Sequence, residues 1–140
     1  MKIEKIENKQ ELEDVIGLIF EKIDKKLSIE DKFLFKSFSY AIKNDGDKIV
    51  GGITGWRIFA EIYIDELILE ENLRGNGYGK KLIKIVEKEM NDGNCDNINL
   101  VTNSFLNATG FYKKCGFEIE FIRKNSKDSR FDKYYMVKKL

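Results

Sequence analysis

Residues 74–80 read Arg-Gly-Asn-Gly-Tyr-Gly-Lys, between an apolar strand-like run and a segment with helical periodicity. Three alternating glycines let the backbone turn tightly and bring its N–H groups close to a ligand. The helix that follows directs its unpaired N-terminal amides, and the positive end of its dipole, at the same place. The pattern therefore predicts an anion site, with phosphate as the favoured anion.

The spacing of these glycines differs from that of other phosphate-binding loops. A dinucleotide loop and a kinase glycine loop both need a third glycine where this chain has Lys80. A Walker loop needs glycine where Arg74 stands, and Ser or Thr where Lys81 stands. What is left is the pattern R-x-x-G-x-G over residues 74–79. A glycine-rich connector that binds nothing is the alternative interpretation.

A second segment, residues 107–117, reads Asn-Ala-Thr-Gly-Phe-Tyr-Lys-Lys-Cys-Gly-Phe. Its Phe-Tyr pair would end a helix, and its Gly-Phe pair would open the next strand. Together with R-x-x-G-x-G, this segment resembles the two signatures of the GNAT acetyltransferase superfamily, which uses acetyl-CoA. The distance between them leaves room for one helix, one strand and the start of a second helix, as that family requires. The resemblance covers residues 62–117 at the level of motifs.

The resemblance implies acyl transfer from the thioester of acetyl-CoA to an amine. The glycine turn would bind the pyrophosphate, and the edge of the preceding strand would pair with the pantetheine arm. Tyr112 would give a proton or a hydrogen bond to the departing sulfur, for which a phenol with an ordinary pKa near 10 is suited. A tyrosine packed in the core is the alternative. The residues implied at the coenzyme are Leu67, Ile68, Leu69, Arg74, Gly75, Asn76, Gly77, Tyr78, Gly79, Lys80, Asn107 and Phe111.

The general base is open between carboxylates of the strand that precedes the glycine turn. Asp65 and Glu66 are the candidates, and a water molecule is the alternative. Strand alternation predicts that Glu61 and Asp65 share a face with Tyr63 and that Glu66 points to the other face.

The chain departs from the family pattern near its second signature. Many relatives carry Asn seven residues before the tyrosine, where this chain has Phe105, and Asn107 is the nearest substitute. In this fold the acceptor cleft is built by the first helices and by the loop between the last two strands, here residues 20–36 and 124–132. These segments leave the acceptor open among small molecules and peptide amines.

Composition excludes several other classes of function. The net charge is +1 from 25 basic and 24 acidic side chains, which gives no broad field for nucleic acid or an anionic membrane. The chain has no His and only two Cys, without metal-ligand spacing, so no metal is expected. No signal-like segment and no apolar run of about 20 residues is present. We therefore expect a cytoplasmic protein, and the resemblance to the GNAT superfamily implies an N-acetyltransferase whose partner is its amine substrate; a homodimer is left open.

Two other functions compete with catalysis. An acyl-CoA-binding sensor without turnover is the first, because no base is obvious. A structural interaction domain of the same fold is the second, although it would not need the glycine turn.

Periodicity and turn signals predict an α/β fold in a single domain over residues 1–140. Its sheet is mixed and mostly antiparallel, with helices on both faces, as in GNAT-like acyl-CoA N-acyltransferases. Strands are predicted over Lys2–Glu7, Phe38–Lys43, Ile49–Ile58, Glu61–Leu69, Ile98–Val101, Phe117–Ile122 and Lys133–Val137. Helices are predicted over Lys9–Lys26, after the glycine turn up to about Asp92, and over Phe105–Lys114, with a short helix or loop over Leu27–Lys36.

Overall fold

The computed structural model describes residues 1–27 and 35–140, so residues 28–34 of the segment predicted over Leu27–Lys36, and part of the predicted acceptor cleft, lie outside the described residues. Contacts divide the chain into two units, residues 1–33 and 34–140. The first unit contains helix α1, Lys9–Leu27, close to its predicted bounds. The Asn8 side chain accepts a hydrogen bond from the Glu11 N–H at 3.3 Å, which stabilises the start of this helix.

The predicted strand over Lys2–Glu7 is wrong. These residues are not assigned to any strand, and the described structure begins its first regular element at Lys9. Within the described residues, no helix is long and apolar enough to span a membrane.

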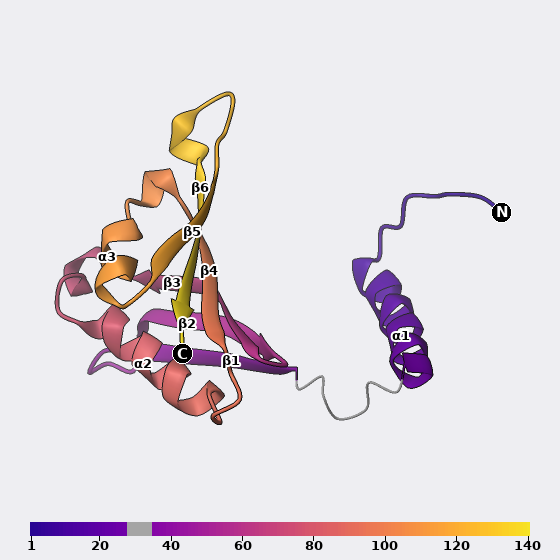
Figure 1. Cartoon of the computed structure of the whole chain (residues 1–140), viewed down its shortest axis with the longest axis horizontal. Helices are drawn as coiled ribbons and strands as arrows, with labels where there is room; N and C mark the ends of the chain where they lie inside the picture. The colour runs from indigo at the N-terminus through magenta and orange to yellow at the C-terminus, as the bar shows by residue number, and fades with distance from the viewer. Residues whose placement is uncertain (28–34) are drawn as a thin grey trace. The chain divides into compact units, whose positions relative to one another are not determined.

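The second unit is a six-stranded sheet with two helices, in the strand order β1-β2-β3-β4-β6-β5 (Figure 1). Among the described strands, β3 and β4 are parallel and the other neighbouring pairs are antiparallel. The predicted mixed, mostly antiparallel sheet is therefore confirmed. Its elements are β1 Lys36–Lys43, β2 Ile49–Ile58, β3 Glu61–Leu69, α2 Tyr78–Met90, β4 Asn97–Asn103, α3 Thr109–Lys114, β5 Glu118–Arg123 and β6 Lys133–Lys139.

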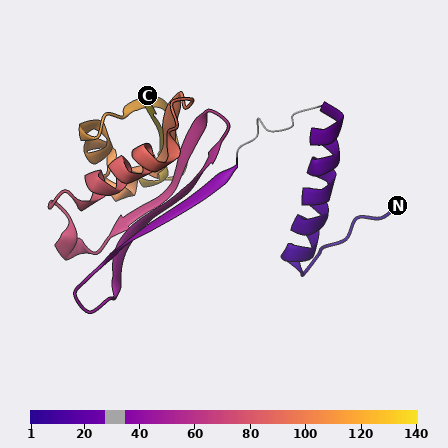
Figure 2. The same cartoon turned by 90° about the horizontal axis from the view of Figure 1, so that it is seen from below.

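The long β1–β2 hairpin turns at residues 44–48, between two of the predicted strands (Figure 2). The Asn44 side-chain oxygen accepts hydrogen bonds from the N–H groups of Gly46 and Lys48, both at 3.0 Å. An Asn side chain that replaces backbone acceptors in this way fixes a tight turn. The conformation of this turn also sets the register of the two strands.

The core of this unit lies between the sheet and α2 and α3, which pack on the same face (Figure 1). Alternate residues of the central strands and one stripe of α2 meet there, as their periods of 2 and 3.6 require. The most enclosed side chains are Ile53, Ile62, Ile83, Val86, Ile98 and Met136.

The predicted helix over Phe105–Lys114 is correct only in its second half. A single 3₁₀ turn spans Ser104–Leu106, and α3 begins at Thr109. Between them Asn107 adopts a left-handed φ of 48°, which no continuous α-helix can include. The helix is interrupted there, so α3 has six residues.

Arg57 of β2 ties the end of α2 to the β2–β3 turn. It is buried, and it donates from Nη1 to the Met90 carbonyl at 2.8 Å and from Nε to the Phe59 carbonyl at 2.9 Å. Nη1 also lies 3.1 Å from Oδ2 of Asp92, which is half-exposed. One guanidinium therefore satisfies a carbonyl that the end of a helix leaves unpaired.

Replacing Arg57 with Met should lower the free energy of unfolding by about 2–4 kcal/mol, because two carbonyl groups lose their donor in a buried place. Urea denaturation measures this change. Asp92→Asn is the control and should change the free energy of unfolding much less, because Asp92 is half-exposed and its ion pair is screened by solvent. Equal effects of the two substitutions would contradict this role of Arg57.

Candidate functional site

The glycine turn leads from β3 to α2 with its amides open to solvent. Gly75 and Gly77 have φ angles of 77° and 82°, and a Cβ atom built on either would meet nothing within 4 Å. Gly77 is the N-cap of α2, without a side-chain hydrogen bond, and the first turn carries no acidic residue. The N-terminal amides of a 13-residue helix therefore face open space, which suits a phosphate.

Two side chains stiffen this turn from within. The Nε of Arg74 donates to the Leu69 carbonyl at 3.2 Å, and Nδ2 of Asn76 donates to the Arg74 carbonyl at 3.2 Å. Arg74 thus keeps its positive charge at the turn while it holds the end of β3. Lys80, in the first turn of α2, is exposed and adds a second positive charge.

Gly79 allows α3 to approach the start of α2. A Cβ atom at this position would lie 2.8 Å from Cζ of Phe111 and 3.8 Å from Cδ1 of Leu69. The first of these distances is shorter than real Cβ contacts allow, so only glycine lets the Phe111 ring pack here. The close contact between Gly79 and Phe111 therefore holds the start of α2 against α3.

A wedge opens between β3 and β4 directly before the glycine turn. The two strands pair from Glu61–Ile64 with Asn97–Leu100, yet β3 continues to Leu69 and β4 to Asn103. In Figure 1 β1 to β3 run across the view, whereas β4 to β6 run up it. Beyond the last pair, residues 65–69 and 101–103 face each other without a ladder. Main-chain N–H and C=O groups on these edges are available to an extended ligand.

The predicted strand residues at the coenzyme line this wedge. Leu67 and Leu69 are half-buried and pack against the core, whereas Ile68 is exposed. Side chains of the first two thus build the core, and their backbone forms the open edge. Asn107 is exposed and donates its backbone N–H to the Ser104 carbonyl at 3.0 Å, so its contact with a coenzyme stays a prediction.

Tyr112 lies in the core beneath this region. Its ring makes edge-to-face contacts with Phe111 at 5.1 Å and Phe117 at 5.7 Å between centroids. Burial raises the pKa of Tyr112 to about 12, with a smaller contribution from Cys115. The phenol therefore keeps its proton throughout the neutral pH range.

The expected facing of the β3 carboxylates is wrong for Glu66. Glu66 pairs with Thr54 of β2, whereas Ile64 pairs with Gly55, so Asp65 is an extra residue in a β-bulge. Paired residues share a face, and so do Thr54 and Trp56, which are two residues apart. Glu66 therefore lies on the face of Trp56 and its stacked neighbour Tyr63.

Asp65 lies on the same side of the sheet as Tyr63. Burial is the main cause that raises the pKa of Tyr63, and the negative charge of nearby Asp65 raises it further. The bulge thus brings two carboxylates, Asp65 and Glu66, to the face of the sheet opposite α2 and α3. It does so at the point where the β3–β4 ladder ends.

Within residues 34–140, the face of the sheet opposite α2 and α3 carries two hollows. The first, of about 570 Å³, lies over β1 to β3, and Glu66 lines it among small residues such as Ser39, Gly52 and Thr54. The second, of about 410 Å³, lies over β3 to β6 and mixes carboxylates with aromatic rings. Its lining includes Glu61, Tyr63, Asn99, Glu120, Phe121 and Tyr135. Both hollows offer acidic groups to a cationic ligand.

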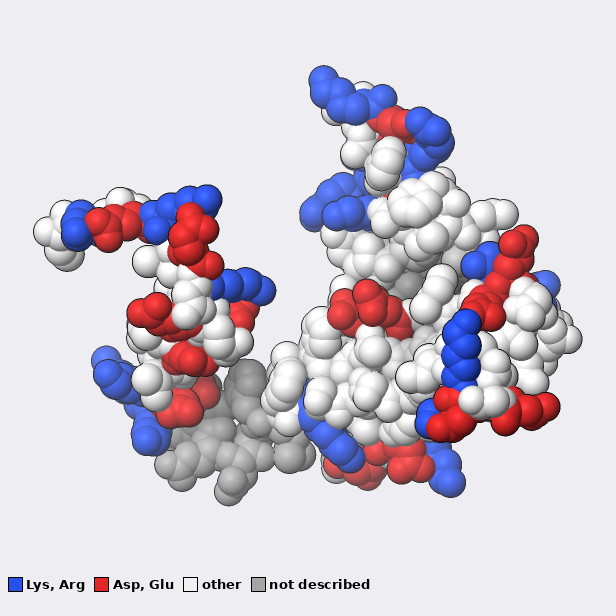
Figure 3. Space-filling view, turned by 180° about the vertical axis from the view of Figure 1, so that it is seen from behind, with Lys and Arg blue, Asp and Glu red and all other residues white. Residues whose placement is uncertain are grey.

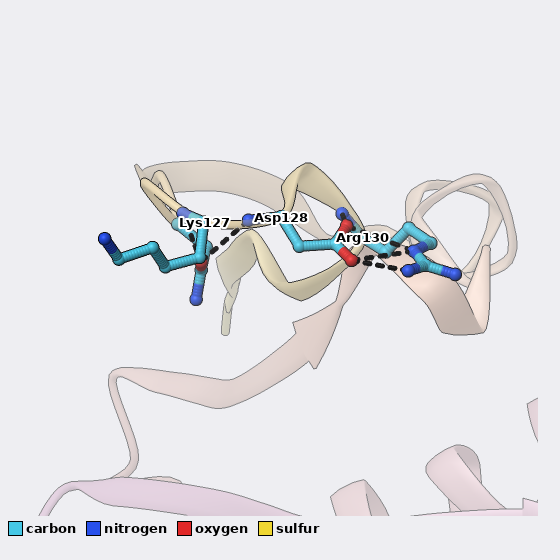
Figure 4. A network of polar contacts seen from close by, with 4 residues as sticks. Lys127, Asp128 and Arg130 are labelled. Carbon is cyan, nitrogen blue, oxygen red and sulfur yellow. Dashed lines mark hydrogen bonds and ion pairs between the residues drawn. The ribbon is translucent and has the colours of Figure 1, made fainter.

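The loop over residues 124–132 is ordered by its own side chains. Asp128 accepts from Nε and Nη2 of Arg130, at 3.0 and 2.6 Å, and Asn125 accepts from two backbone N–H groups (Figure 4). Arg130 therefore holds the pKa of Asp128 below its ordinary value. Basic side chains gather around this loop on the surface (Figure 3).

Asp132 and Phe131 join this loop to the end of β4. The buried Asp132 carboxylate accepts the Asn125 N–H at 2.8 Å, and this contact lowers its pKa. The Phe131 ring packs edge-to-face on Phe105 at 5.6 Å. Phe105, which stands where many relatives carry Asn, thus has a packing role here.

Residues 7–117 match the family model described as the acetyltransferase (GNAT) family. The chain belongs to that family. Among solved structures, an acetyltransferase from Bacillus cereus ATCC 14579 is 28% identical, with a TM-score of 0.78 over 100% of this chain and 99% of that one. The predicted family and fold are therefore confirmed, and the chain is an acetyltransferase of the GNAT family.

Two further solved structures share the GNAT fold at lower identity. An aminoglycoside 6′-N-acetyltransferase complexed with coenzyme A is 18% identical, with a TM-score of 0.62 over 99% of this chain and 97% of that one. The NatC complex bound to Gag peptide and CoA is 24% identical, with a TM-score of 0.60 over 73% of this chain and 70% of that one. No match was found among the curated proteins.

The structure brings most of the predicted coenzyme residues of this GNAT chain to one place. The glycine turn, the end of β3 and Phe111 adjoin one another, with Tyr112 beside Phe111. Sequence reasoning missed the β-bulge at Asp65 and the buried Thr102 of β4. Among the described residues, no group of His, Cys, Asp and Glu could hold a metal ion.

Proposed function

We propose that this chain is an N-acetyltransferase that transfers the acetyl group of acetyl-CoA to the primary amine of a small molecule or peptide, with residues 1–140 acting as one cytoplasmic domain. The wedge between β3 and β4 carries the proposal. It offers unpaired strand edges that begin at the glycine turn, so one extended ligand can place phosphates on the turn and amides in the wedge.

The residues at this site divide the work of binding. Open amides of Gly75 to Lys80 would hold the pyrophosphate, and the charges of Arg74 and Lys80 would add attraction. The backbone of Leu67 to Leu69 would pair with the two amides of the pantetheine arm. Acetyl-CoA supplies the activated acyl group as a thioester. Tyr112 would donate a hydrogen bond to the sulfur as negative charge develops there.

The opposite face of the sheet would receive the acceptor. An amine must lose a proton before it can attack, and a carboxylate within reach can take it. Glu66 is our first choice for this base, because it lines the larger hollow where β3 bulges. Acidic groups in both hollows would attract a cationic amine.

Replacing Glu66 with Gln should lower kcat/KM at pH 7 about 100-fold, because the amide cannot accept the proton of the substrate ammonium. Steady-state kinetics of the variant and the wild type at pH 7 measure this loss. Asp65→Asn is the matched control and should change kcat/KM less than about threefold. A large loss of kcat/KM in Asp65→Asn with little loss in Glu66→Gln would assign the base to Asp65. Unchanged kcat/KM in both variants would assign the base to water.

A screen of acetyl-CoA consumption over diverse amines tests the proposed function. Polyamines, aminoglycosides, amino acids and peptide N-termini should be included, with mass spectrometry of the acetylated product. Turnover of at least one amine supports the proposal. Acetyl-CoA binding without turnover of any of them would support a catalytically silent acyl-CoA-binding module instead.

A further inference from the structure

Thr102 carries a buried hydroxyl group without a partner. The residue is 4% exposed, and its Oγ1 makes no hydrogen bond to any described part of the protein. An enclosed polar atom without a partner costs free energy in the folded state. Such groups are rare in native proteins, and each one calls for a ligand or another compensating role.

The place of Thr102 in the sheet relates this hydroxyl to the wedge. Thr102 pairs with Tyr134 of β6 on one side. On its other side the ladder with β3 has already stopped, at the pair of Ile64 and Leu100. If the register is continued past the bulge, Thr102 stands across the wedge from Leu67. It therefore lies beside the wedge where the edges of both strands are open.

The face on which Thr102 lies is the face of α3. Strand alternation puts Thr102 on the side of Ile98 and Leu100, which belong to the core cluster that also contains Tyr112. Leu67 lies on that side as well, because its β2 partner Ile53 is buried in the same core. The Thr102 side chain is thus on the same side of the sheet as Tyr112, at the level where the wedge opens.

We propose that Thr102 is a coenzyme-binding residue whose hydroxyl hydrogen-bonds a polar group of the pantetheine arm when the arm enters the wedge. The arm carries amide carbonyls, which can accept from the hydroxyl, and amide N–H groups, which can donate to it. This inference rests on the proposed function. It assigns to the bound state the partner that the hydroxyl lacks within the described protein.

The test compares Thr102→Val, which keeps the branched shape and removes the hydroxyl, with Thr102→Ser, which keeps the hydroxyl. Isothermal titration with acetyl-CoA should show Kd raised about 5- to 30-fold in the Val variant and within about threefold of the wild type in the Ser variant. Adenosine 3′,5′-bisphosphate, which has no arm, is the matched probe. It should bind all three proteins equally.

Thermal unfolding of the free protein gives a second readout. The Val variant should be at least as stable as the wild type, because it loses a hydroxyl without a partner and no hydrogen bond. A Val variant that is destabilised while its Kd for acetyl-CoA is unchanged would overturn the proposal, because the hydroxyl would then act within the protein.

The outcome separates this inference from the function on which it rests. If the wild type binds acetyl-CoA through the glycine turn and the Val variant binds it equally well, only the role of Thr102 fails. If the wild type does not bind acetyl-CoA at all, the proposed function and the role of Thr102 are both refuted.

Discussion

Replacing Gly77 with Glu is expected to weaken acetyl-CoA binding at least 100-fold. The new side chain would enter the open space in front of the α2 amides, where the pyrophosphate is expected. Its carboxylate would also repel the phosphates; two like charges about 4 Å apart cost about 4 kcal/mol at an effective dielectric constant of 20. Isothermal titration calorimetry of the variant and the wild type measures the loss.

Gly93→Glu provides a matched control for this experiment. Gly93 also has a positive φ, 91°, and open space around its Cβ position, but it lies in the turn after α2. Both substitutions add one negative charge and both force a side chain into a left-handed conformation, at a cost of about 1–2 kcal/mol. Both variants should therefore lose similar stability, and only Gly77→Glu should lose affinity. Unchanged affinity in Gly77→Glu would count heavily against the phosphate site.

The parts of this fold that the sequence predicted well are those with local causes. The bounds of β2 and β3 were predicted correctly, because both segments are rich in β-branched and aromatic residues and a polar turn precedes β2. The glycine turn could be found because its conformation depends on the residue type at each position: Gly75 and Gly77 do have positive φ. Helix α1 followed from its periodicity alone.

The bulge at Asp65 could not be predicted in the same way. A bulge is a mismatch between two strands, and nothing in the β3 sequence states which β2 residue will face Glu66. One extra residue reversed the facing of Glu66 and moved it to the face of Tyr63. The sequence thus identified Glu66 as a candidate base but did not predict correctly on which side of the sheet Glu66 lies.

Thr102 was missed for a related reason. Threonine is a common strand residue, and its hydroxyl usually finds a partner in the folded protein. Only the structure shows that β4 continues beyond the end of its pairing with β3 and that the Thr102 hydroxyl is buried in this unpaired part. The first predicted strand failed because a strand-like alternation over residues 2–7 is not sufficient to form a strand.

Replacing Tyr112 with Phe is expected to lower kcat about 10²- to 10³-fold and to leave the Kd for acetyl-CoA nearly unchanged, because one donor to developing charge is lost. The raised pKa decides which kind of donor it is. A phenol with a pKa of about 12 holds its proton more tightly than an ordinary thiol, whose pKa is about 8.5. Full transfer would be unfavourable by about 5 kcal/mol, so we expect Tyr112 to donate a hydrogen bond.

The pH dependence distinguishes this role from that of a titrating acid. Because the pKa of Tyr112 is about 12, kcat of the wild type should show no alkaline limb from this residue up to pH 10. The free energy of unfolding should also depend on pH through this residue. Above pH 10 the unfolded chain loses the phenolic proton that the folded chain keeps, so the contribution of Tyr112 to stability falls as pH rises toward 12. The Phe variant should lack that part of the fall.

Tyr134→Phe is the control, because Tyr134 also packs against the core but lies on β6. Its kcat should stay within about threefold of the wild type. If Tyr112→Phe kept the wild-type kcat on an identified amine, Tyr112 would be a packing residue and the leaving sulfur would need no donor from α3. If kcat fell only with a matching rise in the Kd for acetyl-CoA, the hydroxyl would act in binding instead of in the transition state.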